Sequence, residues 1–218
     1  MNFSDMNIIE KLTESFKEFP GIGERQAKRF VYFLMFKNGD YINDLSKLIL
    51  DLKKEIAQCK QCFKFFIISK SNEKNICEIC KDKNVDSSKL MIVEKDSDLE
   101  SMQKSKAYNG KYFILGGLVP VIEKNTKKKI RIEELKQRIS NSPKMVSIEN
   151  QNKLEEIILA FSLNLEGNHT DSYVRDELDK IAKSLDIKIS SLGRGLSTGT
   201  ELEYSDNETL KNALKNRQ

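Results

Sequence analysis

The chain has 218 residues, of which 39% are hydrophobic and 32% charged, a composition typical of a soluble globular protein with one medium domain and small modules. Its formal net charge of +4 is too small to indicate nucleic-acid binding by itself. The longest apolar run, Phe30–Phe36, is far shorter than the roughly 18 residues that span a bilayer, and the early acids Asp5 and Glu10 do not fit an export signal. We therefore expect a cytoplasmic protein with no membrane partner.

Residues 1–57 predict a helical domain. The expected helices cover residues 5–18, 24–36 and 42–57. In the first, Ile8, Ile9, Leu12 and Phe16 share one face, as an amphipathic helix requires. Pro20, Gly21 and Gly23 break the chain between the first two helices.

This break belongs to the segment Phe16-x-x-Phe19-Pro20-Gly21-Ile22-Gly23-x-x-x-Ala27-x-x-Phe30. The glycines allow a tight turn with no side chain between backbone and ligand. The helix that follows begins with free N–H groups and the positive end of its dipole, where a phosphate can dock. The segment matches the helix-hairpin-helix pattern of sequence-independent DNA binders. The alternative is a structural hairpin used for packing or dimerisation.

The net charges of the two helices agree with DNA binding by the second helix. Residues 5–18 contain two lysines and four acids, a net of −2, whereas residues 24–37 contain four basic residues and one acid, a net of +3. Arg25 and Arg29 are one turn apart, so they share a face and can contact neighbouring phosphates. The predicted DNA-binding residues are Gly21, Gly23, Arg25, Lys28 and Arg29.

All the cysteines of the chain fall into two C-x-x-C pairs, Cys59 with Cys62 and Cys77 with Cys80, separated by 14 residues. Two such knuckles supply the four thiolates of one closed, tetrahedral zinc site, and closed sites are structural. Two disulfides or four unrelated thiols are the alternatives, and the expected cytoplasmic location argues against disulfides. We predict a zinc finger over residues 58–81 that binds one structural Zn²⁺ per chain.

From Leu90 onward, short apolar runs alternate with helical stretches. Strands are expected at residues 90–93, 112–115, 157–161 and 187–190, and helices at 97–105, 132–139 and 171–185. This alternation predicts an α/β domain with a parallel sheet over residues 88–185. A C-terminal segment, 186–218, adds a strand, a glycine-rich turn at Gly193–Gly199 and a short helix with the capping box Ser205-x-x-Glu208.

Function in a parallel sheet resides beyond the carboxyl ends of its strands. Glu94 ends the first strand, and the third runs into Ser162-x-Asn164-x-Glu166-Gly167, which is the layout of a Toprim domain. Catalytic Mg²⁺ needs several carboxylates there, but Ser162 and Asn164 stand where aspartates are required. We expect a retained fold with a vestigial acidic pair, Glu94 and Glu166.

Two further features are weaker signals. His169 is the sole histidine, so it is best explained as a surface turn or helix-start residue. The block Lys124, Lys127, Lys128, Lys129 and Arg131 contains no acid, and a solvated loop and a nucleic-acid contact remain equal alternatives for it.

Taken in order, the glycine hairpin, the four-cysteine module, the Toprim-like domain and the C-terminal segment resemble the family of the bacterial recombination mediator RecR. The resemblance covers essentially the whole chain. It also rests on the motifs Ile92-Val93-Glu94, Tyr112-x-Ile114-Leu115-Gly116-Gly117, Leu165-Glu166-Gly167 and Gly195-Leu196-Ser197-x-Gly199-x-Glu201-Leu202-Glu203-Tyr204. The chain departs from the family at Ser162, Leu163 and Asn168, where Asn, Pro and Glu are usual, and in its longer loop between the cysteine pairs.

This resemblance implies a non-enzymatic DNA-repair protein that self-associates into dimers or ring-like tetramers and clamps single- or double-stranded DNA. It further implies RecO, and in many lineages RecF, as partners in loading RecA onto DNA covered by single-strand-binding protein, with Arg25 and Arg29 contacting the DNA. Two other classes remain open: a metal-dependent Toprim enzyme, primase-like or nuclease-like, and a protein-interaction scaffold without salt-sensitive DNA binding.

Overall fold

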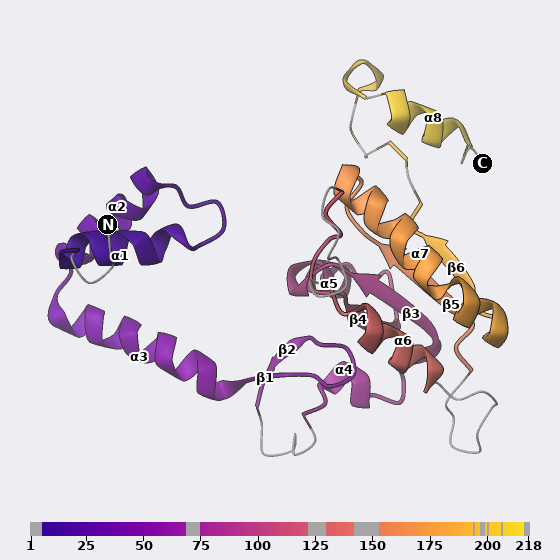
Figure 1. The fold of residues 1–218 in the computed structure, drawn as a ribbon, viewed down its shortest axis with the longest axis horizontal. Coiled ribbons are helices and arrows are strands. Elements are labelled where there is room, and N and C mark those ends of the chain that lie inside the picture. Colours follow the sequence, from indigo (N-terminus) through magenta and orange to yellow (C-terminus); the bar gives the residue numbers. More distant parts are fainter. Residues whose placement is uncertain are drawn as a thin grey trace. The chain divides into compact units, whose positions relative to one another are not determined.

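The computed structural model describes residues 6–68, 75–121, 130–141, 153–193, 195–196, 199, 201–205 and 207–215. The chain divides into two compact units, Met1–Ile56 and Ala57–Gln218 (Figure 1). Among the helices so described, none combines the length and the hydrophobicity needed to cross a lipid bilayer.

The first unit contains the three predicted helices, α1 (Ile8–Lys17), α2 (Glu24–Met35) and α3 (Gly39–Glu55). Asn7 and Glu10 form a capping box that starts α1, each side chain accepting from the other's amide at 3.0 Å. The third helix begins three residues earlier than predicted, because the Asn38 side chain caps it by accepting from the Tyr41 amide at 3.0 Å.

The helices α1 and α2 pack through a small residue and an aromatic contact. Ala27 on α2 is fully buried, which lets the two helices approach closely. The Phe16 ring lies 5.9 Å from that of Phe19 and 5.7 Å from that of Phe30, so three aromatic rings fill the space beside the turn.

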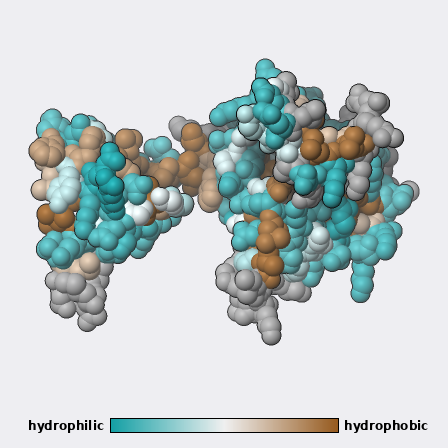
Figure 2. All heavy atoms as spheres, turned by 90° about the horizontal axis from the view of Figure 1, so that it is seen from above, coloured by the Kyte–Doolittle hydropathy of each residue, from teal (hydrophilic) through white to brown (hydrophobic). Residues whose placement is uncertain are grey.

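The helix α3 differs from its neighbours in that no side chain of it is buried. Leu48, Ile49 and Leu52 are 60–69% exposed, and they lie on one side of the helix at the i, i+1, i+4 spacing. We call these three residues the α3 stripe. Apolar patches interrupt the hydrophilic surface of this unit at the left of Figure 2. Exposed apolar patches of this kind mark interaction surfaces.

The second unit is built on a parallel sheet, as predicted. Its strands are β3 (Asp86–Val93), β4 (Gly110–Ile114), β5 (Glu156–Ala160) and β6 (Lys188–Ser191), in the order β4-β3-β5-β6. The connecting helices are α5 (Asp96–Ser105), α6 (Ile132–Ser140) and α7 (Leu165–Leu185). The predicted α/β class is therefore confirmed.

Helices cover both faces of the sheet (Figure 1), and the buried side chains form two layers. On one face Ile92 and Phe113 pack against Leu135 of α6 and Leu178 of α7. On the other face Met91 and its neighbours pack against α5. Alternate residues of β3 point to opposite layers, as the two-residue period of a strand requires. Each fully buried side chain contributes about 2 kcal/mol to this core.

One predicted boundary is wrong by six residues. The sequence predicts a helix from residue 171, whereas α7 begins at Leu165. The Asn164 side chain accepts from the Gly167 amide at 2.7 Å and so starts the helix earlier. Glu166 and Gly167 consequently lie in the first helical turn rather than in a loop.

At the C-terminal end, a 3₁₀ turn at Leu202–Tyr204 precedes α8 (Asn207–Lys215). The predicted final helix is thus confirmed. The Glu208 side chain of the predicted capping box, and residues 194, 197 and 198 of the glycine-rich turn, lie outside the described residues.

Candidate metal centre and candidate nucleic-acid interface

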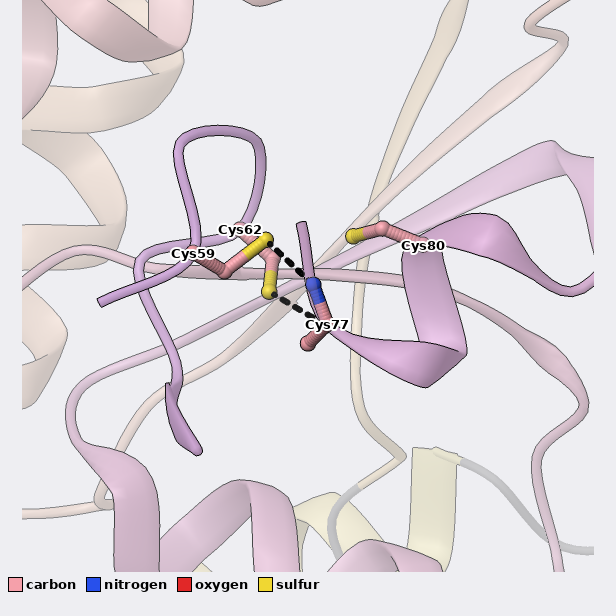
Figure 3. Close-up of side chains that lie close together, drawn as sticks. All are labelled: Cys59, Cys62, Cys77 and Cys80. Atoms are coloured by element: carbon pink, nitrogen blue, oxygen red, sulfur yellow. Dashed lines mark hydrogen bonds between the residues drawn. The ribbon is translucent and has the colours of Figure 1, made fainter. Parts of the chain in front are cut away.

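The four cysteines come together between two short strands and one helical turn. Strands β1 (Ile56–Gln58) and β2 (Phe65–Ile67) form a two-stranded sheet that brackets the first pair, and Cys77 and Cys80 begin and line α4 (Glu78–Lys81). All four Sγ atoms lie within 4.8 Å of one another (Figure 3). Three of the cysteines are buried, and Cys80 is partly buried.

This arrangement fits a single metal ion. At the corners of a tetrahedron with metal–sulfur bonds of about 2.3 Å, sulfur atoms lie about 3.8 Å apart. The Sγ atoms of Cys62 and Cys77 are 3.5 Å apart, and the Cys77 amide donates to the Cys59 Sγ at 3.4 Å. Four thiol sulfurs without an oxygen or nitrogen donor are the set that soft or borderline metals select. The four cysteines can therefore hold one metal ion.

The thiols also influence one another's protonation. Hydrogen bonds from Cys62, Cys77 and Cys80 to the Cys59 thiolate hold the pKa of Cys59 well below its ordinary value. The bond to Cys59 raises the pKa of Cys62, which keeps its proton. Four thiolates cannot all be ionised so close together without a cation, so metal binding would release protons from this cluster.

The turn after the Cys59–Cys62 pair contains a residue with an uncommon backbone conformation. Phe63 has a φ of 63°, in the left-handed region, where a side chain costs roughly 1–2 kcal/mol. Its ring lies 5.3 Å from the Phe113 ring of β4, and the Arg131 guanidinium stands 5.0 Å over its other side. These contacts offset the backbone strain. The sequence showed an apolar stretch here but not its partners.

The glycine hairpin has the predicted backbone. Gly21 has a φ of +76°, which glycine adopts without strain, and Gly23 is the N-cap of α2. The Ile22 amide donates to the Phe19 carbonyl at 3.1 Å and closes the turn. The start of α2 is exposed, so its amides can approach a ligand.

The three predicted basic residues of the hairpin are not equivalent. Arg25, Lys28 and Arg29 are all exposed. Lys28, however, lies 2.6 Å from Glu24 in an ion pair, and this hydrogen bond raises the pKa of Lys28. For Arg25 and Arg29, one turn apart on α2, the described part of the chain supplies no ion pair. They are the stronger candidates for phosphate contact.

The predicted acidic pair, Glu94 and Glu166, lies at the carboxyl edge of the parallel sheet. Glu94 follows β3 and lies 3.8 Å from Lys95, while Glu166 lies in the first turn of α7. Over the described ranges, the cysteines are the sole group of three or more His, Cys, Asp or Glu residues placed to hold a metal ion. Asn164, at an expected aspartate position, caps α7 instead.

Thr170, which the sequence did not single out, and His169 fasten this edge. The buried Thr170 hydroxyl accepts from the Val119 amide and donates to the Glu166 carbonyl, at 2.8 and 2.7 Å. His169 Nδ1 lies 3.2 Å from the Val119 carbonyl, so this histidine is a partly buried residue of the second turn rather than a surface one. Both contacts tie the loop after β4 to α7.

Of the predicted basic block, Lys124, Lys127, Lys128 and Lys129 lie outside the described residues. Arg131 is partly buried, and its Nη1 donates to the Ile114 carbonyl at 3.0 Å. Gly116, with a φ of +95°, makes room for this side chain, since a Cβ there would lie 2.6 Å from Nη1. Arg131 thus has a structural position in the sheet domain.

Comparison with known proteins agrees with this architecture. A Toprim domain model matches residues 88–192, and a model described as RecR, C-terminal, matches residues 195–218. A recombination protein RecR of Dehalococcoides mccartyi is 34% identical over 99% of this chain and 96% of its own length. A recombination protein RecR of Staphylococcus aureus is 32% identical over 96% of both chains.

The chain belongs to the recombination protein RecR family. The resemblance inferred from the sequence is thereby confirmed, as is the Toprim fold of its central domain. The similarity extends over both units and includes the hairpin, the cysteine cluster and the carboxyl edge of the sheet.

Gly167 of this edge permits one test of the geometry. A Cβ on Gly167 would lie 1.8 Å from the Ser162 carbonyl oxygen, a backbone atom that cannot move aside cheaply. We expect Gly167→Ala to lower the free energy of unfolding by about 3 kcal/mol or more, measured by urea denaturation. The matched control is Gly193→Ala, because a Cβ on Gly193 meets nothing within 4 Å. Equal stability of the two variants would contradict the close approach.

Proposed function

We propose that this chain is a non-enzymatic mediator of recombinational DNA repair. It would act as an oligomeric clamp on DNA and, with RecO and where present RecF, help load RecA onto DNA covered by single-strand-binding protein. The observation that carries the proposal is the exposed start of α2, where Arg25 and Arg29 stand beside the Gly21–Gly23 turn. Full-length kinship with recombination proteins supports it.

The hairpin suits the DNA backbone rather than the bases. Backbone amides at a helix start and a pair of guanidinium groups bind phosphate, and phosphate contacts carry no sequence information. One hairpin makes few such contacts, so its affinity is weak, on the order of 10⁻⁴–10⁻⁶ M at physiological salt. Several hairpins on one assembly would gain avidity without new contacts.

The α3 stripe supports such self-association. Leu48, Ile49 and Leu52 would gain most of their burial free energy from a second copy that covers them, since no other described part of the first unit does. Homo-oligomers with closed symmetry are the common outcome of such an interface. A dimer or tetramer would then direct the arginines of several chains to one DNA molecule.

DNA binding is tested by removing both arginines. We expect Arg25→Ala/Arg29→Ala to weaken binding to all sequences alike and to reduce the slope of log K against log salt by about 2, because each phosphate contact contributes about 1. Fluorescence anisotropy over a salt series measures both. Lys104→Ala/Lys180→Ala, which removes one exposed lysine each from α5 and α7, is the control of equal charge. If the arginine variant binds as the parent does, the hairpin is structural.

We propose that the metal is zinc, one ion per chain, with Cys59, Cys62, Cys77 and Cys80 as ligands. A thiolate cluster of this kind belongs in a reducing compartment, which supports a cytoplasmic location. The module has a small core of its own, so metal binding would provide much of its folding free energy.

Elemental analysis of protein purified under reducing conditions is expected to give one zinc per chain, and a Cys62→Ser/Cys80→Ser variant is expected to give none. Chelation should increase amide exchange in residues 58–81 more than in the parallel sheet. A ratio well below one in a protein whose cysteine module remains protected would refute a zinc site.

A metal-dependent Toprim enzyme is the competing function. We propose that the chain has no such enzymatic activity. Among the described residues, neither Glu94 nor Glu166 belongs to a cluster of three or more potential metal ligands. We expect no nuclease, primase or topoisomerase turnover with Mg²⁺ or Mn²⁺. Turnover that is present in the parent and disappears in Glu94→Ala would establish the enzyme instead.

A further inference from the structure

The second cysteine knuckle is held by a lysine from the sheet. Helix α4 is a single turn, so its last carbonyl groups have no partners within the helix. Lys111 of β4 donates from Nζ to the Ile79 carbonyl at 2.9 Å, to the Asp82 carbonyl at 2.8 Å and to the Cys80 carbonyl at 3.4 Å. An ammonium group has three N–H donors, and here all three meet the same turn.

The first knuckle is held in the same way from a different element. Arg138 of α6 donates from Nη1 to the carbonyl of Gln61, which lies between Cys59 and Cys62. The Ile114 amide of β4 donates to the Cys62 carbonyl at 2.9 Å. Each knuckle therefore has one cation from the sheet domain bound to its backbone.

Charge gives these contacts a second role. One divalent ion and four thiolates carry a net charge of −2, and three of the four cysteines are buried. A buried net charge is costly unless charges of the opposite sign lie beside it. Lys111 and Arg138 supply two positive charges, one behind each pair of ligands. The net charge of the metal centre together with these two side chains is zero.

We infer that Lys111 and Arg138 are positioning residues of the metal centre: each orients one knuckle, and together they neutralise the four-thiolate ion. This inference rests on the zinc site proposed above. Outer groups of this kind commonly change metal affinity 10- to 100-fold when they are replaced. The sheet domain, and not the module alone, would then determine how firmly the ion is held.

The test is metal release from the intact protein to a chromogenic chelator. Lys111→Met and Arg138→Met keep an unbranched stem but lose the charge and its donors, and we expect zinc release 10- to 100-fold faster in each. Lys111→Arg and Arg138→Lys retain the charge and should restore most of the difference. Lys83→Met, at an exposed lysine just after the second knuckle, is the control and should release zinc at the parental rate.

Amide hydrogen exchange of β3 shows whether faster zinc release comes from the metal centre or from unfolding of the sheet domain. We expect the β3 amides to be equally protected in all variants. Release within twofold of the parent in both methionine variants overturns the inference and leaves the zinc site standing. Loss of β3 protection together with faster release also overturns it, because the residues would then act through the stability of the whole domain. A parent chain without zinc refutes the zinc site and this inference together.

Discussion

The hydrogen bond from the Ile114 amide to the Cys62 carbonyl joins the cysteine module to the edge of the sheet. A parallel sheet buries both faces, yet its outer strands still carry backbone groups that require partners. At β4 the first knuckle and Phe63 cover this edge. At β6, the other outer strand, Arg175 of α7 donates to the Ile189 carbonyl at 2.9 Å. Each outer strand thus has a backbone group that is bonded by a residue from outside the sheet.

At the carboxyl edge, polar and charged side chains have structural roles. Asn164 caps α7, Thr170 fastens the loop after β4, and Arg131 occupies the space above Gly116. Each of these contacts satisfies a backbone group and leaves no cluster of unpaired carboxylates. A shared fold does not fix the chemistry of such an edge, because function depends on the particular side chains that the fold carries there.

Much of the fold and of the candidate sites is predictable from local sequence. The cysteine spacing, the Gly21–Gly23 turn and the apolar strands each depend on residues close together in the chain. Lys111 and Arg138 were not predictable, since their partners at Ile79 and Gln61 lie 32 and 77 residues away and carbonyl groups have no sequence signature. The sequence predicts too late a start for α7. Asn164 stands where a Toprim enzyme has a metal-binding aspartate, and this comparison conceals its ability to cap a helix.

The helix α3 has a thermodynamic consequence that follows from its lack of any buried side chain. If a second copy covers α3, as proposed above, the stability of the first unit would rise with protein concentration through mass action. Assembly would then stabilise α3, and dilution would destabilise it. The abundance of the protein in the cell would then set the fraction of chains in which α3 is covered.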